Sequence, residues 1–145
     1  QEDEAEADIK DVPETLVSQQ YVVYSPTFRV PTFYFSIHNS MGSPLILADL
    51  IHTTLFHPFA FEHTKLSTFG ITRLQSSFPV LSQGEHPTLG TPCWYLHPCA
   101  TEQAIAELLA EAEAADINPG KDDAEMVRLR RWLEIWFMVL GSAVN

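Results

Sequence analysis

A cysteine stands near the middle of the chain, where an extended segment gives way to a helical pattern. The run Leu96-His97-Pro98-Cys99 is followed by Thr101 and by a helical pattern that begins at Glu102. The first N–H groups of a helix lack backbone acceptors and carry partial positive charge. A thiol among them is expected to ionise more readily, and the thiolate is the nucleophile. The sequence therefore predicts Cys99 as an active-site nucleophile, with Thr101 as the helix cap and Pro98 as a rigid backbone step before the sulfur.

A structural role for each cysteine is the alternative, because unpaired cysteines are among the most buried residues and pack as small apolar side chains. For Cys99 this alternative stays open beside the nucleophile. Cys93 lies inside the preceding apolar run, and we expect it to be a plain core residue. Two cysteines six positions apart do not form a disulfide framework, so a reducing compartment, by default the cytoplasm, is the expected location.

Other chemistries fit the sequence less well. A zinc site would need closer ligand spacing than Cys93 and Cys99 offer. The candidate histidine ligands also fall at irregular intervals, at His52, His57, His63 and His86. A cysteine–histidine pair of the papain type would use His97, but Pro98 turns the segment and no oxyanion-hole signature accompanies it. No glycine-rich phosphate loop is present, so we expect neither a metal nor a cofactor.

Tyr34 is a further candidate, in the aromatic run Thr32-Phe33-Tyr34-Phe35. The ordinary role of a strand tyrosine is packing on a sheet face. The alternative is a phenol that reaches the neighbourhood of Cys99 from an adjacent strand. Tyr34 and His97 are therefore candidate supporting residues of the site.

The charge of the chain narrows the class of partner. Asp and Glu number 19 against 8 Lys and Arg, for a formal net charge of −11. This argues against nucleic acid or an anionic membrane surface as a main partner and would suit a basic protein. Residues 1–14 hold seven carboxylates and only Lys10 as a cation, so we expect an acidic, flexible leader before a single domain at 15–145. No signal peptide or transmembrane segment is expected, because the N-terminus lacks an apolar run and the stretch 132–139 is short and contains Glu134.

Strand patterns come first in the chain. They cover 20–24, 27–37 and 92–96, and a tight connection at Ser25-Pro26 separates the first two. Pro31 interrupts the second pattern, so we expect an edge position or a bulge there. Turn residues fill 38–43, a helical pattern covers 47–55, and a short strand is expected at 71–74. The rest of 56–91 shows no lasting period.

Helical patterns close the chain. One covers 102–115, with its buried face at Ile105, Leu108, Leu109 and Ala112. An Asn-Pro-Gly turn at 118–120 ends that element, and Asp122 or Asp123 caps the final helix, with Glu125 placed for a capping box. We expect the wide apolar face of this helix to dock on the sheet, through Met126, Leu129, Trp132, Leu133, Trp136, Val139 and Leu140. Strands first and helices last describe an α+β domain.

Four segments resemble the autophagy-related protein ten family, whose members are ubiquitin-conjugating-like (E2-type) enzymes. The most specific is the run from Glu85 to Cys99, EHPTLGTPCWYLHPC. Residues 30–35 (VPTFYF) resemble the family's V-P-x-x-Y-F strand core. Residues 42–50 (GSPLILADL) resemble its G-x-P-L-x-L-x-D turn into a helix, and 132–135 (WLEI) its closing helix. The H-P-C triplet alone is less specific, because the lipid-conjugating relative, autophagy-related protein three, also carries it.

The resemblance implies a fold and a reaction. The fold would be like that of ubiquitin-conjugating enzymes, an antiparallel sheet packed against helices with the catalytic cysteine at a strand-to-helix junction. Cys99 would accept the modifier autophagy-related protein twelve as a thioester from the activating enzyme, autophagy-related protein seven. It would then pass the modifier to a lysine of the acceptor, autophagy-related protein five. His97, Tyr34 and Pro98 would be supporting residues.

Two departures from known patterns leave alternatives open. Ordinary ubiquitin conjugators place an H-P-N triplet upstream of their cysteine, whereas here the triplet holds the nucleophile, so the oxyanion role of that asparagine does not transfer. Ala100 also stands where the family often has a basic residue. One alternative is a non-catalytic adaptor with the same fold, and the other is the lipid-conjugating branch, which transfers a modifier to phosphatidylethanolamine. The stretch 56–91 is shorter than the inserted regions of that branch, which favours modifier twelve.

Overall fold

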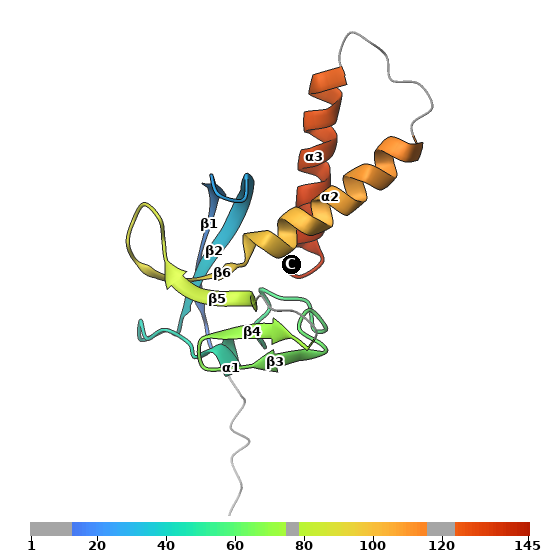
Figure 1. The fold of residues 1–145 in the computed structure, drawn as a ribbon. Helices are drawn as coiled ribbons and strands as arrows, with labels where there is room; N and C mark the ends of the chain where they lie inside the picture. Colours follow the sequence, from blue (N-terminus) through green and yellow to red (C-terminus); the bar gives the residue numbers. More distant parts are fainter. Residues whose placement is uncertain (1–12, 75–78, 116–123) are drawn as a thin grey trace, which may run out of the picture.

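A computed structural model describes residues 13–74, 79–115 and 124–145. Within these residues a six-stranded antiparallel sheet has the order β1-β2-β6-β5-β4-β3. Its strands are β1 (Val17–Ser25), β2 (Val30–His38), β3 (Thr64–Leu66), β4 (Gly70–Arg73), β5 (Pro79–Glu85) and β6 (Pro92–Leu96). The helices are α1 (Leu47–Leu50), α2 (Pro98–Ala115) and α3 (Ala124–Gly141). The α+β class is confirmed, and Figure 1 shows α2 and α3 projecting together from one side of the sheet.

The strands β1 and β2 form a regular hairpin around the expected tight connection at 26–29. Their register runs without interruption from Val17 opposite His38 to Ser25 opposite Val30. The expectation of a bulge at Pro31 is therefore wrong, and β2 is an inner strand between β1 and β6, but at Pro31 itself the side of β2 that faces β6 has no strand partner among the described residues, as at an edge. Pro31 is tolerated because it precedes the short segment that pairs with β6, Tyr34 and Phe35. Its missing N–H removes no bond from that ladder.

The helix expected at 47–55 is a single turn, α1. Leu47 and Leu50 are buried, as the pattern predicted, but the chain continues in turns from Ile51. The Thr53 hydroxyl donates to the Leu50 carbonyl at 2.8 Å. Such local side-chain bonds offer the backbone an alternative to the helical ladder. The short strand expected at 71–74 is present as β4, whereas β3 and β5 were not predicted.

The main core lies on one face of the sheet, under α1 and the last residues of the chain. Phe35 is completely buried there, with Phe56 packed edge-on at a ring-centroid distance of 5.3 Å. The C-terminal residues close this core, because the Asn145 N–H donates to the Leu55 carbonyl at 2.8 Å and Val144 is buried. The core therefore packs β2, β5 and β6 together and fixes the end of β6, from which the chain enters α2.

A second core joins the two long helices to the start of β2. It consists of Val30, Ile105, Ile135 and Trp136, and the Trp136 indole N–H donates to the Pro31 carbonyl at 2.9 Å. The buried face predicted for α2 is confirmed at Ile105, which is buried, and at Leu108 and Leu109, which pack against this core, whereas Ala112 is only partly buried.

The expectation that α3 docks on the sheet along its whole apolar face is wrong. Trp136, Val139 and Leu140 pack, but three residues of the same predicted face are exposed: Met126, Leu129 and Leu133. The reason is that α3 packs mainly on α2 and reaches the sheet only near its C-terminal end (Figure 1). The leader up to residue 12, the turn at 118–120 and the predicted caps Asp122 and Asp123 lie outside the described residues.

Candidate active site

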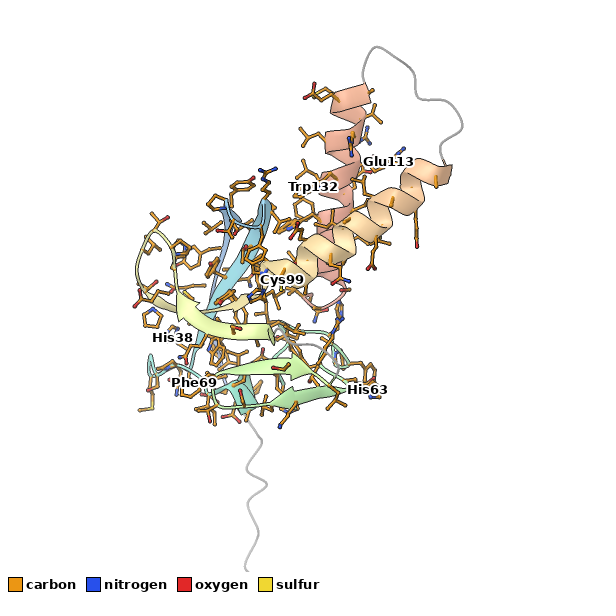
Figure 2. The ribbon with its side chains drawn as sticks, in the orientation of Figure 1. His38, His63, Phe69, Cys99, Glu113 and Trp132 are labelled. Carbon is orange, nitrogen blue, oxygen red and sulfur yellow. The ribbon has the colours of Figure 1, made fainter. Side chains whose placement is uncertain are left out.

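Cys99 is the second residue of α2 and is half-buried. The preceding strand β6 has the bounds that the sequence predicted, and it leads directly into the helix. Figure 2 shows Cys99 where α2 leaves the sheet, with Glu113 near the other end of the helix. The position places the sulfur in the first turn, where unpaired N–H groups and the helix dipole favour negative charge.

The start of α2 differs from the prediction. The helix begins at Pro98, four residues before the expected start, so Thr101 lies inside it and is not its cap. Proline suits a first helical position, because its φ angle is already helical and its missing N–H would have had no partner.

His97 takes the capping role that was predicted for Thr101. The Nδ1 of its ring accepts a hydrogen bond from the Cys99 backbone N–H at 3.3 Å, and the His97 backbone N–H donates to the Val80 carbonyl at 2.9 Å. The ring also packs edge-on against Phe28, at a centroid distance of 5.6 Å. Burial lowers the pKa of His97 below its ordinary value. The neutral ring that accepts at Nδ1 carries its proton on Nε2.

This geometry predicts a pH dependence of stability that comes from His97. The pKa of His97 in the folded protein lies below the ordinary 6.5. At a pH between the two values, His97 is mostly protonated in the unfolded chain and mostly neutral in the folded protein. The stabilising contribution of the neutral ring is complete above about pH 6.5 and is lost as the pH falls toward the folded-state pKa.

The variant His97→Asn tests this effect, because asparagine keeps a side-chain acceptor for the helix N–H but does not titrate. We expect urea unfolding at pH 7.5 and 5.5 to show a larger loss of stability in the parent protein than in the variant. The five remaining histidines are common to both proteins, so they cancel in the difference. An equal loss in both would contradict the capping role.

Tyr34 joins the site through a row of aromatic rings. It pairs with Tyr95 across β2 and β6, and their ring centroids are 5.3 Å apart. Tyr95 in turn lies 6.1 Å from His97. Burial, and secondarily the neighbouring Tyr95 and Cys93, raises the pKa of Tyr34 above its ordinary value. The phenol therefore keeps its proton at neutral pH and can donate a hydrogen bond.

Tyr95 and His86 belong to the same row, and sequence reasoning missed both. The His86 ring is buried and lies 5.8 Å from the Tyr34 ring and 4.7 Å from that of Tyr21. The Tyr95 ring lies over Gly84 of the neighbouring strand β5. A Cβ added at Gly84 would come within 2.8 Å of that ring. A repeated His-Pro pair was the available signal, since it occurs at 57–58, 86–87 and 97–98. In the second and third copies the histidine Nδ1 accepts the N–H two residues on, that of Thr88 at 3.1 Å and that of Cys99 at 3.3 Å.

Cys93 has the structural role that the sequence predicted. It is 3% exposed, against the half-buried Cys99, and its sulfur lies 3.9 Å from the Thr91 hydroxyl. Among the residues that the structure describes, no three histidine, cysteine or acidic side chains gather as a metal site would require. Nor does any helix in those residues have the length and apolar character needed to cross a membrane.

Comparison with known proteins places this arrangement in a family. Residues 1–145 match the family model described as "Autophagocytosis associated protein, active-site domain". The chain is 29% identical over 131 residues to the ubiquitin-like-conjugating enzyme ATG10 of Dictyostelium discoideum, covering 90% of this chain and 51% of the relative. It is 28% identical over 135 residues to the human enzyme of that name (91% and 50%), and 31% identical over 125 residues to that of Arabidopsis thaliana (86% and 47%). The chain thus spans about half the length of these relatives.

The match runs through both halves of the site, the strand that carries Tyr34 and the junction that carries Cys99. It also agrees with the four sequence segments that resembled the autophagy-related protein ten family, and that resemblance is confirmed. This chain belongs to the family defined by the active-site domain of autophagocytosis-associated proteins.

Proposed function

We propose that this chain is the catalytic part of an E2-type conjugating enzyme of autophagy, with residues 15–145 as its catalytic domain. Cys99 carries a ubiquitin-like modifier as a thioester. The observation that supports this most directly is the contrast between the two cysteines. Cys99 is only partly buried in the first turn of α2, whereas Cys93 is buried in a strand. The names of the relatives support the same activity.

The reaction has two transfers that use the same sulfur. In the first, the Cys99 thiolate attacks the thioester carbonyl at the C-terminal glycine of the modifier, so a new C–S bond forms and the bond to the activating enzyme breaks. In the second, a neutral lysine amine attacks that carbonyl, an amide bond forms as the C–S bond breaks, Cys99 leaves as a thiolate, and the proton lost from the amine passes to solvent. The sulfur is anionic at the start and at the end, and the first turn of a helix favours that charge.

The supporting residues act on geometry and hydrogen bonding. Pro98 and the His97 cap fix the backbone on which the sulfur is carried. Burial raises the pKa of Tyr34, so its hydroxyl keeps its proton, and burial lowers the pKa of His97, so its ring stays neutral with the proton on Nε2 while Nδ1 accepts the Cys99 N–H. Such donors stabilise negative charge that develops on a carbonyl oxygen during acyl transfer.

Following the family resemblance, we assign autophagy-related protein twelve as modifier, protein seven as activating enzyme and protein five as acceptor, all in the cytoplasm. The test mixes the purified chain with the activating enzyme, ATP and one modifier at a time. We expect a thiol-sensitive adduct on a non-reducing gel with modifier twelve. An adduct only with the modifier of the lipid-conjugating branch would move the chain to that branch. No adduct with either modifier, although Cys99 reacts with an alkylating reagent, would make it an adaptor.

A further inference from the structure

His86 is the most tightly bonded residue of the loop between β5 and β6. Its backbone N–H donates to the Thr91 carbonyl at 2.8 Å, and its carbonyl accepts the Gly90 N–H at 2.9 Å. The Nδ1 of its ring accepts the N–H groups of Thr88 and Leu89, each at 3.1 Å. These bonds fix both the backbone and the ring of His86, which is only 6% exposed.

The fixed ring packs against two tyrosines of neighbouring strands. Tyr21 of β1 and Tyr34 of β2 are directly opposite each other in the ladder, so their side chains project from the same face of the sheet. The His86 ring meets that of Tyr21 edge-on at a centroid distance of 4.7 Å and lies 5.8 Å from that of Tyr34. His86 therefore contacts Tyr34 from the side of β1.

Tyr95 contacts Tyr34 from the other side, because β6 lies across β2 from β1. The two ring centroids are 5.3 Å apart. The Tyr95 ring is itself fixed, since it occupies the space that the missing Cβ of Gly84 leaves. A tyrosine on an open sheet face can exchange between staggered rotamers, whereas Tyr34 has a fixed ring on each side and keeps one orientation.

An acyl-transfer site gains rate when the donor that meets the developing negative charge is already in place. The Tyr34 hydroxyl is such a donor only as long as its rotatable side chain is held. We propose that His86 is a positioning residue for acyl transfer, which holds the Tyr34 ring against Tyr95 and does not itself touch the substrate. This role rests on the proposed function, because Tyr34 serves as a donor only if Cys99 carries a thioester.

Two variants separate the ring of His86 from its hydrogen bonds. His86→Asn keeps an oxygen acceptor for the loop N–H groups but removes the ring, whereas His86→Phe keeps a ring but leaves those N–H groups without their acceptor. The activating enzyme charges each protein with autophagy-related protein twelve, and the isolated thioester is then mixed with free lysine. We expect His86→Asn to discharge about tenfold more slowly than the parent. His86→Phe should recover most of that rate, although it unfolds at a lower urea concentration.

Two further measurements establish whether His86 acts through Tyr34. In a Tyr34→Phe background, His86→Asn should slow the discharge no further, because the group that it positions is already gone. An NMR titration of ¹³C-labelled tyrosine in the uncharged protein needs no modifier. Burial raises the pKa of Tyr34, and removal of the His86 ring should bring that pKa down toward its ordinary value.

His63→Asn is the matched control for His86→Asn. His63 is exposed, and Figure 2 shows it well away from Cys99. Its φ angle of 57° is one that asparagine also adopts readily. The variant should leave both the discharge rate and the Tyr34 pKa unchanged.

The outcomes distinguish the role of His86 from the proposed function. A further loss of rate in the Tyr34→Phe background, or an unchanged Tyr34 pKa in His86→Asn, would overturn the role of His86. A parent protein that forms no thioester would refute the proposed function instead, and the titration would still report whether His86 holds Tyr34. If His86→Asn does not fold, Tyr21→Leu removes the ring against which His86 packs and leaves the loop bonds in place. It should slow the discharge and lower the Tyr34 pKa in the same way.

Discussion

Cys99→Ser is expected to convert a thiol-sensitive adduct with the modifier into one that survives dithiothreitol. The serine oxygen can occupy the position of the sulfur in the first turn of α2, but it forms an ester, which thiols do not exchange. Because the hydroxyl is far less ionised than a thiol, the adduct should also form more slowly. Cys99→Ala leaves no nucleophile at this position and should give no adduct.

Cys93 provides the matched control, since it lies six residues away on the strand that leads to the site. It is 3% exposed, and its side chain packs in the sheet. Cys93→Ala should therefore retain the reducible adduct once its folding has been confirmed by a thermal melt. The assay is a non-reducing gel, run with and without dithiothreitol, on the three variants and the parent. A reducible adduct in Cys99→Ala would refute the assignment of the nucleophile.

The largest loss of stability from a single substitution is expected at Trp136. Its side chain is 3% exposed, it packs in the core between α2, α3 and β2, and its N–H is bonded to the Pro31 carbonyl. Truncating a buried Trp to Ala costs about 3–5 kcal/mol. The neighbouring Phe137 is 64% exposed and packs only edge-on against Trp136 at 5.0 Å, so Phe137→Ala should cost about 1 kcal/mol or less.

The pair of variants tests how the long helices are held to the sheet. Urea unfolding of the parent, Trp136→Ala and Phe137→Ala gives the three free energies of unfolding. Trp136→Phe isolates the hydrogen bond, because it keeps an aromatic ring but leaves the Pro31 carbonyl without its donor, at a cost of about 1–3 kcal/mol. Similar losses for Trp136→Ala and Phe137→Ala would show that α3 is not anchored at Trp136.

The elements that sequence reasoning placed correctly are those decided by local composition. The run at 92–96 is short, apolar and bounded by prolines, so both the strand β6 and the burial of Cys93 could be predicted. The one-turn length of α1 could not, because the apolar period continues to Leu55, whereas the helix ends at Leu50, where local bonds such as that of the Thr53 hydroxyl to the Leu50 carbonyl compete with the helical ladder. The exposed half of α3 was missed for a different reason. An apolar stripe predicts that a face will pack, but it does not say which part of the stripe meets a neighbour.

The residues of the candidate site also differ in whether local sequence could predict that they lie together. Cys99, Pro98 and His97 are adjacent in sequence, so one local element brings them together, although the cap was assigned to the wrong residue. Tyr34 is connected to them only through Tyr95, its partner where β2 and β6 pair, whose ring lies 6.1 Å from that of His97. That register depends on chain segments some sixty residues apart, and no local pattern encodes it. His86 is part of the row for the same reason.

The repeated histidine–proline turn has a consequence for how such triplets are recognised. In the copy at 86–87 the imidazole Nδ1 accepts hydrogen bonds from the backbone N–H groups of Thr88 and Leu89, which lie in a loop. In the copy at 97–98 it accepts one from the backbone N–H of Cys99, in the first turn of a long helix. The third His-Pro pair, His57-Pro58, differs, because the Nε2 of its ring lies 2.8 Å from the Gly141 carbonyl. The same local hydrogen bond is therefore made in two of the three copies, once with no thiol beside it. What distinguishes the copy at 97–98 is the eighteen-residue helix that begins at its proline, whose dipole favours negative charge in the first turn, where Cys99 lies. A search for related enzymes should weigh what comes after the triplet more heavily than the triplet.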